Sequence, residues 1–172
     1  LTPYMLLFSF LIVYLEEERW VTRNILAILL IILFSFGIEY VGVNYGYLFG
    51  DYKYGSILGF KYYQVPVIIP LTWAMLSIAA RSLINLVTNQ YVISALLSAI
   101  VITAYDFLLE LVAVRFGWWW WANGEIPVFN YVCWFIFSFV FQLFFKKIPS
   151  ITGRSYWMIF VHLLFYWVLL LM

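Results

Sequence analysis

Three carboxylates in apolar surroundings are the residues of this sequence best suited to chemistry. Asp106 and Glu110 lie in the run "YDFLLELVAV", and Glu39 closes the run "NILAILLIILFSFGIEY". A spacing of four residues puts Asp106 and Glu110 on one face of a helix, one turn apart. Ionisable side chains inside apolar spans usually face a bundle interior or a cavity. The three acids are therefore the predicted catalytic residues, although each of them could instead pair with a tyrosine, a tryptophan or the backbone.

Carboxyl groups in different surroundings can divide acid and base work between them. A carboxylic acid in an apolar pocket can keep its proton near neutral pH, whereas one in a wetter position stays ionised. Such a pair can protonate a carbon–carbon double bond and then deprotonate the water that captures the tertiary carbocation. The predicted donor is Asp106, with Glu39 and Glu110 as base or cation stabiliser. The sequence leaves these labels interchangeable.

Motifs for other chemistries are absent from the sequence. There is no phosphate-binding glycine loop, cysteine cluster, histidine-rich box or nucleophile elbow, so we expect neither a metal nor a redox cofactor. His162 has no partner at metal-ligand spacing and is predicted to be a hydrogen-bonded core histidine.

The composition indicates a chain surrounded by lipid. Of 172 residues, 67% are hydrophobic and 10% charged, against about 45–50% apolar and about 25% charged in soluble domains. The net charge of +1 leaves no basic patch for nucleic acid. We therefore predict a multi-pass integral membrane protein, with the lipid bilayer as its partner. The sequence begins at Leu1 rather than at a methionine, and its first apolar run lacks the flanks of a signal peptide.

Six apolar segments predict the architecture. In lipid a spanning segment must satisfy its own backbone, so each segment is expected to be a helix. Together they predict one all-α domain over residues 1–172, a polytopic bundle of about six transmembrane helices. The segments are 3–15, 24–43, 65–80, 91–113, 128–145 and 156–172.

The charges between these segments predict an orientation. Basic residues collect on one side of the membrane, which is expected to be the cytoplasmic side. Both chain ends as given are then expected outside. The cytoplasmic group is Arg19, Arg23, Arg81, Lys146, Lys147 and Arg154, and the opposite side has Lys53, Lys61 and Arg115.

Two parts of the chain share an order of acid, small residue, glycine, aromatic residue and proline. The first reads "EYVGVNYGYLF" and later "VPVIIPLTW", and the second reads "ELVAVRFGWWW" and later "IPVFNYVCW". We predict an internal repeat with units at about 36–80 and 103–145, the first having the longer loop. The units start two spans apart and cross the membrane in the same direction, so an axis along the membrane normal would relate them. Glu39 and Glu110 are then expected at the same depth.

Aromatic residues near these acids suit an apolar substrate. An interfacial belt is the default interpretation of such residues. Four consecutive tryptophans cannot all face lipid on a helix, however, so at least one of residues 118–121 should line the interior. Aromatic rings there would shield a carbocation. The predicted substrate-binding residues are Trp73, Trp118, Trp120, Trp134, Tyr47 and Asn130.

The stretches "IEYVGVNYGYLFGDYKYGSILGFKYYQVPVIIPLTW" and "YDFLLELVAVRFGWWWWANGEIPVFNYVCWF" resemble the carotenoid biosynthesis membrane protein family. That family includes bisanhydrobacterioruberin hydratase and related carotenoid hydratases, and the likeness covers most of residues 36–140. The resemblance implies an inner-membrane protein of a prokaryotic cell that acts on a carotenoid or another polyisoprenoid.

We therefore predict a cofactor-independent carotenoid hydratase of the hydro-lyase type, which adds water to an acyclic end group. A lycopene-cyclase-like enzyme is the nearest rival, because it shares the protonation but closes a ring instead of capturing water. A proton-coupled transporter would also suit membrane acids at matching depth. A structural subunit with incidental acids is a further alternative.

Overall fold

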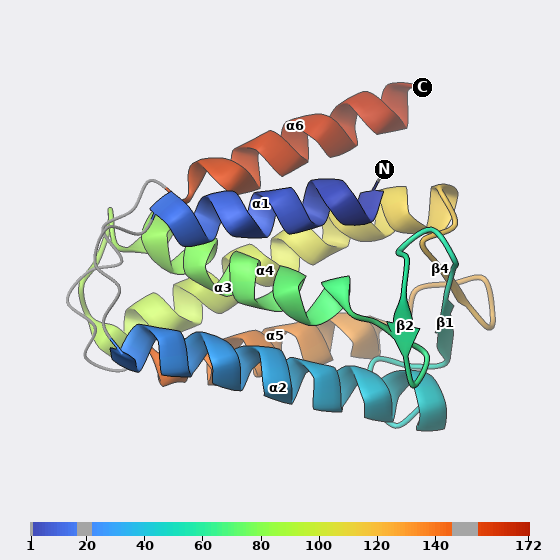
Figure 1. Ribbon diagram of the computed structural model, residues 1–172, viewed down its shortest axis with the longest axis horizontal. Coiled ribbons are helices and arrows are strands. Elements are labelled where there is room, and N and C mark those ends of the chain that lie inside the picture. The colour runs from blue at the N-terminus through green and yellow to red at the C-terminus, as the bar shows by residue number, and fades with distance from the viewer. Residues whose placement is uncertain (1, 17–21, 146–154) are drawn as a thin grey trace.

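A computed structural model describes residues 2–16, 22–145 and 155–172 as an up-and-down bundle of helices (Figure 1). Each of the six predicted segments overlaps one helix, which confirms the helical part of the prediction. The helices are α1 (Thr2–Glu16), α2 (Thr22–Tyr45), α3 (Ile68–Ile84), α4 (Tyr91–Arg115), α5 (Val128–Phe144) and α6 (Trp157–Leu171).

Helices α2 and α4, which carry the predicted acids, run in the same direction, and each is followed by a left-handed glycine. In each case the glycine comes seven residues after the glutamate: Gly46 has φ +68° and Gly117 has φ +67°. The Gly46 N–H donates to the carbonyl of Gly42, 2.8 Å away, and that of Trp118 to the carbonyl of Ala113, also 2.8 Å away. A left-handed glycine of this kind closes a helix at little steric cost.

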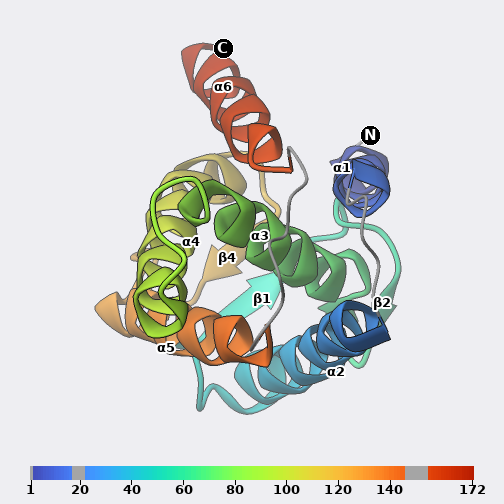
Figure 2. The same cartoon turned by 90° about the vertical axis from the view of Figure 1, so that its left-hand side faces the viewer.

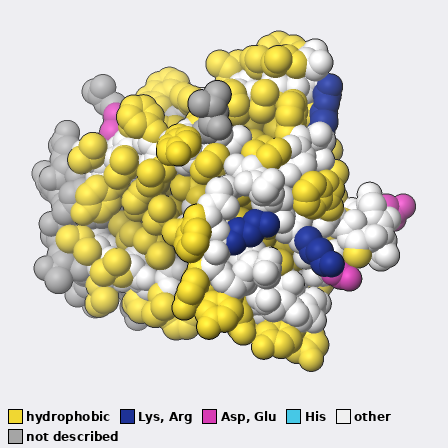
Figure 3. Space-filling model, turned by 45° about the vertical axis from the view of Figure 1, so that its right-hand side comes forward, with side chains coloured by type: hydrophobic (Ala, Val, Ile, Leu, Met, Phe, Trp, Pro, Cys, Tyr) yellow, Lys and Arg dark blue, Asp and Glu magenta, His cyan; other side chains and the backbone are white. Residues whose placement is uncertain are grey.

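Two helical segments, Asn24–Tyr45 and Tyr91–Arg115, are long and apolar enough to cross a membrane. The other four apolar helices have 15–17 residues. Figure 3 shows a broad apolar surface over the helices, with Lys and Arg side chains nearer the end that carries the strands.

The basic residues predicted for the cytoplasmic side are only partly described. Arg19, Lys146, Lys147 and Arg154 lie outside the described residues, as does the side chain of Arg23. Arg81 is buried, and its Nη2 donates to the carbonyl of Gln142 at 2.8 Å. Arg81 therefore belongs to the bundle interior rather than to a loop.

Two small antiparallel sheets, which the sequence did not predict, accompany the six helices. Strand β1 (Tyr52–Tyr54) pairs with β4 (Trp119–Trp121), and β2 (Lys61–Tyr62) pairs with β3 (Val65–Pro66). Residues 119–121 of the tryptophan run thus form a strand after the end of α4, and not helix. Because side chains alternate along a strand, Trp119 and Trp121 are buried whereas Trp120 is 53% exposed.

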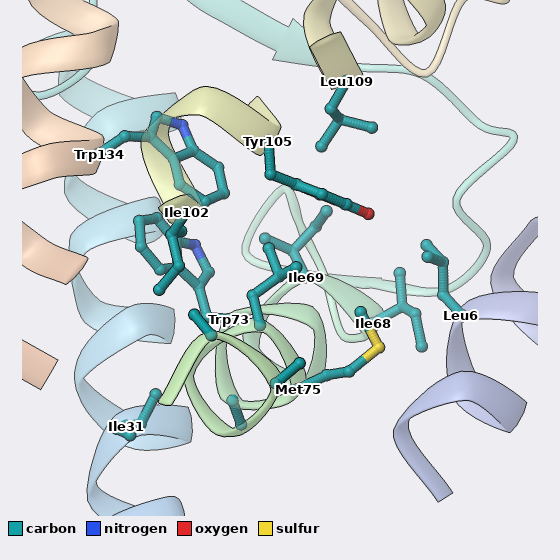
Figure 4. Close-up of a cluster of buried hydrophobic side chains, with 14 of the residues drawn as sticks. Leu6, Ile31, Ile68, Ile69, Trp73, Met75, Ile102, Tyr105, Leu109 and Trp134 are labelled. Carbon is teal, nitrogen blue, oxygen red and sulfur yellow. The ribbon is translucent and has the colours of Figure 1, made fainter. Parts of the chain in front are cut away.

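Helix α3 is the centre of the bundle (Figure 2). Nearly all of its residues are buried, and it contacts every other helix. Figure 4 shows Ile69, Trp73 and Met75 of α3 among Leu6 of α1 and Trp134 of α5. The strands β1 and β4 lie across one end of this bundle (Figure 1).

The close approach of β1 and β4 yields a stability prediction. A Cβ at Gly55 would collide with the carbonyl oxygen of Gly117, and the Gly55 N–H donates to the Trp118 carbonyl at 2.7 Å. We expect Gly55→Ala to lower the free energy of unfolding by about 1–3 kcal/mol, the usual effect of overpacking. Thermal unfolding in detergent measures the change.

Gly37→Ala is the matched control, because a Cβ at Gly37 meets nothing within 4 Å. Alanine is also the better helix former within α2. The explanation fails if the two substitutions lower the unfolding midpoint equally.

Candidate active site

A small cavity, of about 40 Å³, lies beneath the β1–β4 sheet, at the end of the bundle where α2 and α4 finish. Two acids, Glu39 and Glu110, line it. The rest of its wall is largely aromatic, and Asn130 is its one amide side chain. The aromatic lining residues are Phe49, Tyr52, Tyr54, Trp73, Trp119, Trp121 and Trp134.

Glu39 accepts three hydrogen bonds although its side chain is only 3% exposed. Its Oε2 accepts from the hydroxyls of Tyr52 at 2.7 Å and Tyr54 at 2.6 Å. Its Oε1 accepts from the indole N–H of Trp73 at 2.9 Å. A buried carboxylate is costly unless it is hydrogen-bonded, and these three donors supply that compensation.

The two tyrosines act as donors over the whole physiological pH range. Burial, and then the negative charge of Glu39, raises the pKa of Tyr52 and of Tyr54 well above the usual range. Both hydroxyls therefore keep their protons and remain directed at the carboxylate.

Glu110 is held in the same manner by different donors. Its Oε2 accepts from the indole N–H groups of Trp119 at 2.9 Å and Trp121 at 3.0 Å. Its Oε1 accepts from Nδ2 of Asn130 at 3.2 Å. The burial of Trp119 and Trp121 thus has a purpose beyond packing, because both indoles donate to the acid.

Asp106 lies one helical turn deeper than Glu110 and does not line the cavity. Its Oδ2 accepts from Nδ2 of Asn130 at 3.0 Å, the same nitrogen that donates to Glu110. An amide nitrogen has two protons, so Asn130 can bind both acids at once. Oδ1 of Asp106 is buried without a hydrogen-bond partner in the described part of the chain.

The two glutamates are thus bound by the same order of elements. Each accepts from alternate residues of the strand that follows its own helix, and then from the next helix, α3 or α5. The paired register places Tyr52 opposite Trp121 and Tyr54 opposite Trp119. The two strands that hold the acids are therefore also each other's partners.

We call residues 35–80 the first half and residues 103–145 the second half. Two residues distinguish the second half from the first. Four residues before its glutamate the second half has Asp106, where the first half has Ser35. Four residues before its tryptophan the second half has Asn130, where the first half has Ile69. The bridged pair of acids therefore belongs to one half alone.

Trp73 and Trp134 meet face to face on the cavity wall. Their ring centroids are 3.9 Å apart with an interplanar angle of 14°, and Figure 4 shows the two indoles side by side. They come from corresponding places in α3 and α5, each seven residues after a proline.

The other predicted substrate-binding residues lie elsewhere. Trp120 points to the outer face of the sheet, because a strand alternates its side chains. Tyr47 is 74% exposed beyond the end of α2 and stacks on Tyr45. Trp118 is buried against Tyr166, with ring centroids 6.2 Å apart, and lines a neighbouring cavity. The structure brings Trp73, Trp134 and Asn130 to the acids.

Four residues that bind the acids were not among the predicted site residues, namely Tyr52, Tyr54, Trp119 and Trp121. Their signal in the sequence is the spacing of two between aromatic donors, shortly after a glutamate and a glycine. That spacing is informative only once the segments are recognised as strands.

His162 is a hydrogen-bonded core histidine, as predicted. Its Nδ1 lies 2.8 Å from the hydroxyl of Tyr105, and its Nε2 lies 2.9 Å from Oγ of Ser9. Among the described residues, no three His, Cys, Asp or Glu side chains gather as a metal site.

Known proteins include a relative of this chain and a family whose sequence model matches it. A bisanhydrobacterioruberin hydratase of Haloarcula japonica is 29% identical over 156 residues, which cover 83% of this chain and 53% of that protein. The chain thus spans about half the length of this relative. No solved structure matches the chain significantly. The sequence model of the carotenoid biosynthesis protein family matches residues 1–172, and the chain therefore belongs to that family.

Proposed function

We propose that this protein is a carotenoid hydratase, which adds water to a terminal carbon–carbon double bond of an acyclic carotenoid or similar polyisoprenoid. One observation carries the proposal: Glu39 and Glu110 line a single aromatic cavity, and Glu110 is bridged to a further buried acid. The family and the hydratase relative support a carotenoid as the substrate class.

Asp106 and Glu110 are the proton-donating pair in this proposal. Asn130 holds both acids, and ionising both would place two like charges close together in apolar surroundings. The pair therefore shares one proton. Because Glu110 lines the cavity and Asp106 does not, Glu110 delivers that proton to the double bond and Asp106 acts as its proton partner. The sequence left the donor and base roles interchangeable. In this assignment Glu110 takes the donor role that the sequence analysis gave to Asp106.

Glu39 is the base. Three donors stabilise its ionised form, and no second acid shares them. Proton transfer from Glu110 to one alkene carbon leaves a tertiary carbocation on the other. Water attacks that carbon, and Glu39 takes the proton that the water loses. The product has gained one water, and proton exchange through cavity water restores the two acids.

The aromatic wall stabilises and shields the carbocation. The indole N–H groups of Trp73, Trp119 and Trp121 all donate to carboxylates, so these rings have only their apolar surface to offer to a substrate. A desolvated cation–π contact contributes about 2 kcal/mol. The wall therefore favours the cation without offering it a nucleophile.

The proposed setting is a prokaryotic inner membrane, spanned by all six helices. Two long apolar helices and the broad apolar surface in Figure 3 support this setting. A bilayer would also dissolve the substrate. The acids lie at the end of the bundle that carries Lys53, Lys61 and Arg115, which the distribution of basic residues assigns to the outer side.

An end-group cyclase remains the second candidate because of one observation. The hydroxyl and N–H groups of the tyrosines and of three tryptophans on the cavity wall already donate to the acids. Few groups other than the carboxylates are left to hold a water molecule. A cyclase would protonate the same double bond and need no water.

Product mass separates these functions. We expect a lycopene-producing host that expresses this chain to accumulate a carotenoid heavier by one water. Asp106→Asn and Glu110→Gln should each lower the yield by about 100-fold or more, the usual contribution of a general acid. Mass spectrometry of extracted carotenoids, with the variants shown to be folded in the membrane, makes the measurement.

A product of unchanged mass would replace the hydratase with the cyclase. No product from folded protein would reject both.

The tryptophan run offers a matched pair of variants. Trp119→Phe removes one donor from Glu110, whereas Trp120→Phe changes the outer face of the same strand. A hydrogen bond to a charged group contributes about 1.5–3 kcal/mol, so we expect Trp119→Phe to slow conversion by about 10-fold or more. Trp120→Phe should leave the rate unchanged. Initial rates in membranes test this, and equal rates in both variants would remove the assigned role of Trp119.

A further inference from the structure

The cavity between the two glutamates, which we call the acid cavity, has one indole in its wall that donates to no acceptor in the described part of the chain. This indole is that of Trp134, which is only 8% exposed. The hydroxyl of Thr72 in the same wall donates to the carbonyl of Ile68 at 3.0 Å. The remaining aromatic donors of the wall are all bound to glutamate, namely Tyr52, Tyr54, Trp73, Trp119 and Trp121.

Asn130, one helical turn before Trp134 on α5, contributes a free acceptor. Its Nδ2 donates to Asp106 and Glu110, whereas its Oδ1 accepts no hydrogen bond from the described residues. Neither this Oδ1 nor Nε1 of Trp134 is among the unpartnered polar atoms that are sealed from water. Residues four apart lie on one face of a helix, and both residues line the acid cavity. The wall thus offers a donor and an acceptor on the same face of α5.

The first half has no such pair. Trp73, the counterpart of Trp134, donates its indole N–H to Glu39 at 2.9 Å. The counterpart of Asn130 is Ile69, which has no polar atom in its side chain. In the second half the amide of Asn130, rather than the tryptophan, is the donor from the helix to the glutamate. The N–H of Trp134 is therefore left free.

This pair lies close to both glutamates. Trp134 stacks on Trp73 with ring centroids 3.9 Å apart, and Trp73 is bound to Oε1 of Glu39. Asn130 is bound to Glu110. The acid cavity, of about 40 Å³, has room for water, because one molecule needs at least about 10–15 Å³. A buried water molecule typically makes about three hydrogen bonds, and this wall can supply them.

We propose that Trp134 and Asn130 bind the water molecule that captures the carbocation. The water accepts from the N–H of Trp134, and it donates one proton to Oδ1 of Asn130 and the other to Glu39. Its remaining lone pair forms the new C–O bond, and Glu39 takes the proton that it already faces. This inference rests on the proposed function, since it takes the reaction to be a hydration.

Deuterium labelling separates the capture of water from the protonation that precedes it. A carbocation that water does not capture loses a proton from a neighbouring carbon and becomes an alkene again. In heavy water this alkene can retain the deuterium that it received from Glu110. Mass spectrometry of carotenoids from lycopene-loaded membranes in heavy water therefore measures both hydrated lycopene and labelled lycopene.

We expect Trp134→Phe to lower the ratio of hydrated to labelled lycopene by about 2- to 10-fold, because the water loses one hydrogen bond. Phenylalanine keeps an aromatic ring in the wall. A general loss of folded protein would lower both products together and leave this ratio unchanged.

Trp119→Phe is the matched variant, because it removes an indole donor from Glu110 in the same wall. That change acts on the proton donor, so it should lower hydration and labelling together. The role of Trp134 is wrong if Trp134→Phe also lowers the two products in parallel.

A second measurement needs no substrate. In isotope-labelled protein in detergent, we expect the indole N–H of Trp134 to show a stronger nuclear Overhauser effect to water than those of Trp119 and Trp121. Both of the latter donate to Glu110. The three signals are assigned by their loss in the corresponding Trp→Phe variants. An effect at Trp134 no stronger than at the other two would overturn its binding of water.

The two measurements distinguish the two ways to fail. Hydrated product with an unchanged ratio in Trp134→Phe would overturn the role of Trp134 alone. A folded parent chain that forms neither hydrated nor labelled lycopene would overturn the proposed function, and with it the role of this water as the nucleophile.

Discussion

The burial of carboxylates in an apolar interior is the constraint on which the rest of this structure depends. An unpaired ionised carboxylate in such surroundings is prohibitively costly, so each glutamate needs several donors. Those donors come from strands and helices that follow it in the chain: Tyr52, Tyr54 and Trp73 for Glu39, and Trp119, Trp121 and Asn130 for Glu110. These contacts depend on three features of the chain. Each acid-bearing helix ends shortly after its glutamate, the chain returns as a strand, and the next helix then begins.

Different side chains donate to the two glutamates, and this difference fits different roles for them in the proposed reaction. Tyrosine hydroxyls dominate around Glu39 and indole N–H groups around Glu110. The second half alone adds Asp106 and the amide of Asn130, which binds both of its acids. The proposed hydration needs a proton donor on one side and a base stabilised by hydrogen bonds on the other, and the two groups of donors fit that division.

The β1–β4 sheet separates two kinds of surroundings. Its inner face presents the donors that hold the acids, and its outer face presents Lys53 and Trp120 to a polar hollow. The sheet therefore keeps the buried acids apart from the polar surface.

The sequence by itself determined the six helices and the matching depth of Glu39 and Glu110. Long apolar runs leave the backbone no alternative to helix in lipid. The shared order of acid, glycine and proline can be read directly from the sequence. The short strands were not legible, because three residues such as 119–121 become a strand only by pairing with residues 52–54, far away in the chain. Tertiary structure also decided which tryptophans turn inward and that Asp106 lies behind the cavity wall. Both depend on how β4 and α4 are rotated against their neighbours, and packing between distant segments sets that rotation.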